Sequence, residues 1–246
     1  MKQFYHLGRY VIWLGKIFSK PEKLKIYYKE TITQIEQIGL GSIKLVLIIS
    51  VFIGAVTAVQ LSYQFGEGLM PMYYIGYALR EMVVVELAPT IIGLVLSGKI
   101  GSNIAAEIGG MRQKEIIDAM EVMGVNTQGY IVLPKLLAGI FSVPMLIIIA
   151  AFLSILSGFF VATGFGIMTP GEYIKGLNSY YSSYTLFIMV IKAFVFGFII
   201  ITVSAYNGYF VKGGSRELGK AGTDAIVYSD ILILVFDYLI AQLMMG

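Results

Sequence analysis

The 246-residue chain contains no cysteine and only one histidine, His6. Disulfide bonds and thiolate metal sites are therefore excluded, and one histidine cannot supply the several imidazoles of a metal centre. Charged residues are also scarce, at 13% of the chain, whereas hydrophobic residues make up 57%. Because soluble domains carry about 25% charged residues, this composition is typical of a polytopic membrane protein.

Long apolar runs predict the membrane spans. About 20 apolar residues cross a hydrocarbon core of ~30 Å, and such runs fall at 43–61, 82–106, 131–163, 184–205 and 225–245. The third run is long enough to be one tilted helix or two short ones. With one helix there and a cytoplasmic N-terminus, most of the 18 lysines and arginines lie on the cytoplasmic side. The sequence thus predicts an all-α membrane protein with five spans, forming a single domain over 1–246.

Residues 1–42, before the first span, are predicted to form interfacial helices. Apolar residues recur there at helical spacing, opposite a set of basic residues: Phe4, Leu7, Val11, Leu14 and Phe18 against Lys2, Arg9 and Lys16. A helix of this kind packs either on the protein's own core or in the membrane interface. Its basic face favours the interface, where anionic headgroups lie.

Small residues continue from the second span at four-residue intervals in two adjacent registers. They are Ser97, Gly101, Ala105 and Gly109, and Gly98, Ser102, Ala106 and Gly110. Such a stripe lets another backbone approach closely. The partner is either another span of the same chain or a second subunit.

Residues 214–221, GSRELGKA, have the spacing of a phosphate-binding P-loop, but Ala221 replaces the hydroxyl residue that magnesium needs. No strand precedes the segment, and the loop is too short for the α/β domain that would shape it around phosphates. Any nucleotide chemistry must therefore lie on another chain.

Three ionisable residues, Glu86, Lys192 and Asp237, lie inside predicted spans, where a central charge costs on the order of 3 kcal/mol. At about 1.5 Å per residue they fall in the same half of the membrane. Lys192 and Asp237 form either a structural ion pair or part of a site for a polar headgroup. Pro89 is predicted to bend or break the second span, and Asp230 to lie at the interface.

Residues 107–126, EIGGMRQKEIIDAMEVMGVN, are predicted to form an amphipathic helix between the second and third spans. One arc of its wheel is apolar and rich in methionine, and the other is charged. Arg112 and Glu115 are three residues apart and are predicted to pair. The helix either folds onto neighbouring loops or offers a docking surface to another protein.

The run VELAPTIIGLVLSGKIGSNIAAEIGGMRQKEIIDAMEVMGVN, residues 85–126, resembles the MlaE/YrbE family of ABC-transporter permeases, as do AYNGYF at 205–210, Lys192 and Asp237. The resemblance implies a permease subunit that moves phospholipid or a related lipid between membranes, without catalytic residues, metal or cofactor of its own. It implies a homodimer, a cytoplasmic ATPase dimer that holds ATP and magnesium, an MCE-domain protein and no nucleic acid. The implied location is the bacterial inner membrane, with the N-terminus cytoplasmic and the C-terminus periplasmic.

The same resemblance implies roles for individual residues. Residues 107–126 would be the coupling helix that seats in the ATPase, with these residues for contact or orientation: Glu107, Arg112, Glu115, Asp118 and Met123. An outer lipid cavity would be lined or supported by Glu86, Lys192 and Asp237, with acyl-chain contacts from Leu61, Tyr63, Phe65, Met70 and Tyr74. Val85 and Ala88 replace the family's usual arginine and glycine, which implies either that Lys192 is the main positive group or that the substrate is less acidic.

Two other functions compete with this interpretation. The three charges in the spans would suit an ion-coupled secondary carrier of an amphipathic substrate, although the sequence shows no inverted repeat. A membrane-embedded lipid-modifying enzyme is disfavoured, because the chain has no histidine-, cysteine- or carboxylate-rich constellation at an interface.

Overall fold

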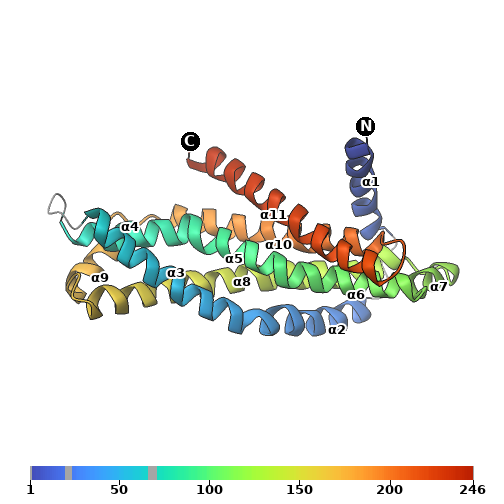
Figure 1. The fold of residues 1–246 in the computed structure, drawn as a ribbon, viewed down its shortest axis with the longest axis horizontal. Helices are drawn as coiled ribbons and strands as arrows, with labels where there is room; N and C mark the ends of the chain where they lie inside the picture. Colours follow the sequence, from blue (N-terminus) through green and yellow to red (C-terminus); the bar gives the residue numbers. More distant parts are fainter. Residues whose placement is uncertain (1, 20–23, 66–70, 246) are drawn as a thin grey trace. The chain divides into compact units, whose positions relative to one another are not determined.

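A computed structural model describes residues 2–19, 24–65 and 71–245, and every regular element in those ranges is a helix (Figure 1). Within these ranges, five helices are long and apolar enough to cross a membrane: Tyr27–Phe65, Tyr73–Gln113, Thr127–Gly164, Ser183–Tyr209 and Ser215–Met244. The five predicted spans are therefore confirmed, and the chain is a multi-pass membrane protein. The third run is one continuous helix, α8 (Thr127–Gly164).

The first two spans are longer than predicted and contain π-helical turns. The first consists of α2 (Leu24–Ile35), η1 (Glu36–Leu40) and α3 (Gly41–Phe65). The second consists of α4 (Tyr73–Met82), η2 (Val83–Leu87), α5 (Ala88–Leu96), η3 (Ser97–Gly101) and α6 (Ser102–Gln113). Pro89 follows η2, so the helix continues through the proline by means of a wider turn and does not break there.

The chain divides into two compact units, each assembled from three segments. Unit 1 comprises Met1–Ser42, Leu94–Val143 and Val195–Val235, and unit 2 comprises Ile43–Gly93, Pro144–Phe194 and Phe236–Gly246. Three long helices, α8, α10 (Ser183–Tyr209) and α11 (Ser215–Met245), contribute to both units. The single domain over 1–246 stays a prediction.

In unit 1, one register of the small-residue stripe packs inside the chain. A Cβ added at Gly101 would lie 2.7 Å from the Ser204 hydroxyl of α10, and one added at Gly208 would lie 2.7 Å from the Ala105 carbonyl oxygen. In the other register, no described heavy atom beyond their own helix lies within 4 Å of a Cβ added at Gly98 or Gly110. The first register therefore has a close partner, whereas the second has none at its two glycines among the described residues.

Asp230 of α11 also takes part in this packing, because its carboxylate accepts a hydrogen bond from the Ser97 hydroxyl. The carboxylate is half-buried. It therefore connects α11 to the second span within unit 1. The sequence analysis placed Asp230 at the interface and did not predict this contact.

In unit 2, α3 and α8 approach closely at Gly54, where an added Cβ would lie 1.8 Å from the Ser154 carbonyl oxygen. The Ser154 hydroxyl donates to the Ser50 carbonyl at 2.9 Å. A short helix that the sequence analysis did not predict, α9 (Pro170–Asn178), packs on α4 through Gly76 and Gly176. Thr169 and Glu172 form a capping box at its start, a pattern that is visible in the sequence.

Candidate functional site

Lys192 of α10 is the centre of a charged cluster in unit 2. Its side chain is fully buried, and its Nζ lies 2.8 Å from Asp237 Oδ1 and 3.0 Å from Glu86 Oε1. The structure thus brings together the three ionisable residues that the sequence placed in the same half of the membrane. The predicted Lys192–Asp237 ion pair is present, and Glu86 joins it.

Pro89 explains how the second span contributes a further partner to this lysine. A proline has no N–H, so the carbonyl four residues earlier, that of Val85, loses its usual helical donor. The Lys192 Nζ donates to this carbonyl oxygen at 3.0 Å. Val85 therefore contributes a backbone oxygen to the cluster.

Thr90 is a member of the cluster that the sequence analysis missed. Its hydroxyl donates to Asp237 Oδ2 at 3.0 Å, so both oxygens of that carboxylate are engaged. Its place directly after Pro89 in an otherwise apolar stretch was the available signal. With this hydrogen bond, α11 is connected to both α5 and α10.

The cluster combines one cation with two carboxylates of unequal exposure. The side chain of Asp237 is 14% exposed and that of Glu86 is 45% exposed, whereas Lys192 is 0% exposed. Glu86 is therefore the member that an incoming ligand reaches first. The half-exposed carboxylate of Glu86, beside the Lys192–Asp237 ion pair, can accept a hydrogen bond or bind a cation.

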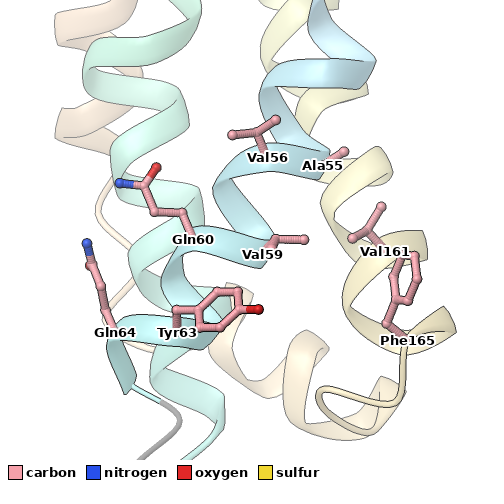
Figure 2. A pocket seen from close by; sticks show the side chains of 8 residues that line it. All are labelled: Ala55, Val56, Val59, Gln60, Tyr63, Gln64, Val161 and Phe165. Carbon is pink, nitrogen blue, oxygen red and sulfur yellow. The ribbon is translucent and has the colours of Figure 1, made fainter.

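Two largely apolar grooves flank the end of α3 in unit 2. The first, of about 570 Å³, lies between α3 and the end of α8 and is lined by Ala55, Val56, Val59, Gln60, Tyr63, Gln64, Val161 and Phe165. Figure 2 shows Val59 and Tyr63 directed toward the segment that carries Val161 and Phe165, with Gln60 and Gln64 on the other side of α3. The second groove, of about 510 Å³, lies between α3 and the second span, and Leu61, Met82 and Leu87 contribute to its walls.

The predicted acyl-chain contacts fall in different places. Leu61 is buried and lines the second groove, whereas Tyr63 is 83% exposed and lines the first. Tyr74 stacks on Tyr73 of α4, with ring centroids 4.7 Å apart. Phe65 ends α3, and Met70 lies outside the described residues.

The predicted coupling segment 107–126 is two helices and not one. The second span ends at Gln113, Glu115 adopts a left-handed backbone with φ 57°, and α7 (Ile116–Val122) follows. Nothing in the sequence marks this turn, because a left-handed residue is usually glycine or asparagine. The chain reverses enough at Glu115 for side chains of α7 to reach α6.

Arg112 pairs with Asp118 at 2.9 Å and approaches Glu121 at 3.9 Å. The predicted pairing of Arg112 with Glu115 is therefore wrong, because the turn at Glu115 interrupts the helical spacing on which it depended. The Tyr209 hydroxyl donates to Glu121 at 2.7 Å, so α7 is also connected to α10.

Glu107 forms a second ion pair of unit 1, at 2.7 Å from the Nζ of Lys135 in α8. Lys135 also donates to Gln34 Oε1 of α2 at 3.1 Å.

Beyond these internal contacts, α7 and the residue after it leave an apolar surface uncovered within the described structure: Ile116, Val122 and Met123 are 43%, 89% and 71% exposed. Glu107 and Arg112 therefore hold the segment in place, and Met123 belongs to its outward surface.

Comparison with known proteins identifies the family. The family model for the permease MlaE matches residues 31–243. A probable ABC transporter permease protein of Rickettsia bellii is 32% identical over 237 residues, which are 96% of this chain and 91% of the relative. The intermembrane phospholipid transport system permease protein MlaE of Haemophilus influenzae is 26% identical over 245 residues, 99% of this chain and 93% of the relative. The match covers most of the sequence and includes all three residues of the charged cluster, so the chain belongs to the MlaE permease family.

Proposed function

We propose that this chain is the membrane-spanning subunit of an ABC transporter that moves phospholipid or a related lipid between membranes. The observation that carries the proposal is the nearly full-length match to ABC transporter permeases, one of which is named for intermembrane phospholipid transport. ATP hydrolysis is assigned to separate chains, with ATP and magnesium held there. The chain itself has no catalytic residues, metal or cofactor under this proposal.

The lipid is assigned to unit 2. The grooves beside α3 offer apolar walls for acyl chains, with Leu61 and Tyr63 as contacts and Tyr74 as a further predicted contact. Glu86 is the exposed member of the charged cluster and would meet the polar headgroup, while Lys192 and Asp237 support it. A headgroup ammonium would pair with Glu86 directly, whereas a phosphate would have to displace a carboxylate from Lys192.

The coupling function is assigned to α7 and the turn before it. The exposed Val122 and Met123 next to charged Glu115 and Asp118 suit a docking surface for the ATPase. Closure of the ATPase dimer would push on α7, and the ion pairs of Arg112 and Glu107 would carry the displacement into α6 and α8. Glu107 and Arg112 are thus positioning residues in this mechanism.

The assembly implied by the family includes further partners. We assign a homodimer, a cytoplasmic ATPase dimer and an MCE-domain protein on the periplasmic side of a bacterial inner membrane, with the N-terminus cytoplasmic. The unoccupied register of small residues at Gly98 and Gly110 supports a close contact with a second copy. The distribution of lysine and arginine supports the orientation.

Purification from the native host in mild detergent, followed by mass spectrometry of proteins and lipids, tests the assignment. An ATPase, an MCE-domain protein and phospholipid should co-purify with the chain. An ion-coupled carrier would also contain a charged cluster of this kind. This alternative predicts that the chain transports without an ATPase. A chain that purifies alone and transports in vesicles under a proton gradient, without nucleotide, would overturn the ABC assignment.

The role of α7 has a separate test in the purified complex. Glu115→Lys should lower lipid-stimulated ATP hydrolysis without changing the thermal unfolding midpoint. Asp118→Lys should lower hydrolysis as well, and it also removes the ion pair with Arg112. Glu36→Lys, which reverses an exposed charge elsewhere in unit 1, is the matched control and should leave hydrolysis unchanged. Full hydrolysis in both α7 variants would remove these residues from the coupling surface.

A further inference from the structure

Helix α1 (Lys2–Ile17) has two different apolar sides among the side chains described, which begin at Gly8. Trp13 and Ile17 are buried, and Trp13 packs on the ring of Tyr206 in α10 and on the ring of Phe210 directly after α10, at centroid distances of 5.6 and 6.5 Å. The opposite side carries Val11 and Ile12, which are 58% and 66% exposed. The helix therefore packs on the protein and also presents an uncovered apolar surface, as a helix between protein and bilayer would.

Arg9 lies at the border between these two sides, and its guanidinium sits 3.7 Å from the centroid of the Phe210 ring. This contact holds the cation at the rim of a cavity of about 410 Å³ in unit 1. The cavity lies among α1, the end of α10 and the start of α11. Part of its lining comes from residues 214–221, the segment with the spacing of a P-loop. In the structure this segment forms the first turns of α11.

Two lysines complete the positive side of the cavity. Lys212 and Lys220 line it together with Arg9, and within the described part of the chain neither lysine forms an ion pair. Glu217 and Asp224 are the carboxylates of the lining, and Glu217 accepts the Gly214 N–H at 3.0 Å, which caps the start of α11. The cavity therefore has a surplus of cations beside an apolar helix surface.

We propose that this cavity binds the phosphate of an anionic phospholipid that stays with the protein and is not the transported molecule. The guanidinium of Arg9 and the ammonium groups of Lys212 and Lys220 would donate to the phosphate oxygens. The acyl chains would lie along Val11 and Ile12 of α1. A free anion needs only the cations, whereas a phospholipid also needs the adjoining apolar surface, so the lipid is the occupant that fits both features.

Trp13 makes the proposal measurable, because it is the only tryptophan of the chain and contacts two rings that line the cavity. The protein is placed in phosphatidylcholine nanodiscs that contain either brominated-acyl phosphatidylglycerol or brominated-acyl phosphatidylcholine at equal mole fraction. Bromine quenches tryptophan fluorescence at short range. We expect stronger quenching by the brominated phosphatidylglycerol in the wild-type protein.

Variants that spare the packing of α1 separate this site from general attraction to the membrane. Each lysine near an anionic surface contributes about fivefold to binding, so Lys212→Gln and Lys220→Gln should each lower the preference for phosphatidylglycerol by roughly fivefold. Lys114→Gln removes an exposed lysine of the same unit that does not line the cavity and should keep the preference. Unquenched Trp13 emission that is the same in all variants would show that the fold is intact.

Three results would overturn the proposal. The first is equal quenching by the two brominated lipids in the wild-type protein. The second is a preference that survives the loss of both Lys212 and Lys220. The third is a Trp13 response to inorganic phosphate in plain phosphatidylcholine discs, dependent on the same lysines, without any preference for phosphatidylglycerol; that result would identify a site for a free anion.

Discussion

Among the side chains that the structure describes, each unit buries one lysine, and the two lysines have different surroundings. Lys135 in unit 1 faces one carboxylate, Glu107, and the neutral amide of Gln34. Lys192 in unit 2 faces two carboxylates and a backbone carbonyl. The side chains are similarly buried, at 3% and 0% exposure, so burial does not distinguish them.

The balance of charge does distinguish them. The charges of Lys135 and Glu107 cancel. A neutral pair is sufficient for a contact whose only role is to hold α2, α6 and α8 together. The Lys192 cluster has one carboxylate more than its cation can neutralise, and unpaired charge within a span is costly. A structural role alone does not explain the second carboxylate, and this difference favours unit 2 as the ligand-binding part of the chain.

The largest effect is expected when Lys192 is removed. Lys192→Met leaves two carboxylates together, one of them only 14% exposed, and breaking a buried ion pair from one side costs about 3–5 kcal/mol. Unfolding measured in mixed detergent and SDS micelles should show that loss, and bound lipid should fall with it. Unchanged stability together with unchanged bound lipid would mean that Lys192 is neither structural nor functional.

The next largest effect is the recovery of stability when a second substitution is added to Lys192→Met. Lys192→Met combined with Asp237→Asn removes both ions of the pair while leaving Glu86 able to reach water. We expect the double variant to regain about 2–3 kcal/mol of the stability lost in Lys192→Met, because the deeply buried unpaired charge is gone. The double variant keeps the surplus charge on Glu86, so if lipid binding depends on that charge, bound lipid should recover together with stability.

Removal of the other lysine should have a smaller effect. Lys135→Met leaves Glu107 unpaired, but that side chain is 41% exposed and can be hydrated. The expected loss is about 2 kcal/mol, the contribution of hydrogen bonds to a charged group. Lipid binding should be preserved, and ATP hydrolysis of the complex should respond less to lipid. A loss of bound lipid equal to that of Lys192→Met would remove the distinction between the two units.

The sequence predicted the spans and the three ionisable members of the Lys192 cluster for a simple physical reason. Apolar length and the cost of a buried charge are properties of residue type and depth, and both can be counted along the chain. Counting residues along spans four and five therefore places Lys192 and Asp237 at matching depth, and the structure pairs them at 2.8 Å.

Contacts that depend on local backbone geometry were not predictable in this way. The break of segment 107–126 at Glu115 depends on one residue with positive φ, and no propensity rule selects a glutamate for it. The exposure of Val11 and Ile12 on α1 depends on which side Trp13 places against α10. A helical wheel shows that a helix has two sides, but it does not show which tertiary partner takes which side.

The smallest effect concerns the hydrogen bond from Thr90 to Asp237, which has no counterpart around Glu107 among the described hydrogen bonds. Thr90→Val keeps the shape of the side chain and removes the donor, so the stability loss should be about 1 kcal/mol. Thr163→Val is the matched control in the same unit, because its hydroxyl donates only within its own helix, to the Phe159 carbonyl, and should change stability less. If the two variants are indistinguishable in stability but only Thr90→Val alters bound lipid, Thr90 positions Asp237 for the ligand and contributes little to the fold. Equal behaviour of the two variants in both measurements would instead mean that the second oxygen of Asp237 needs no protein donor.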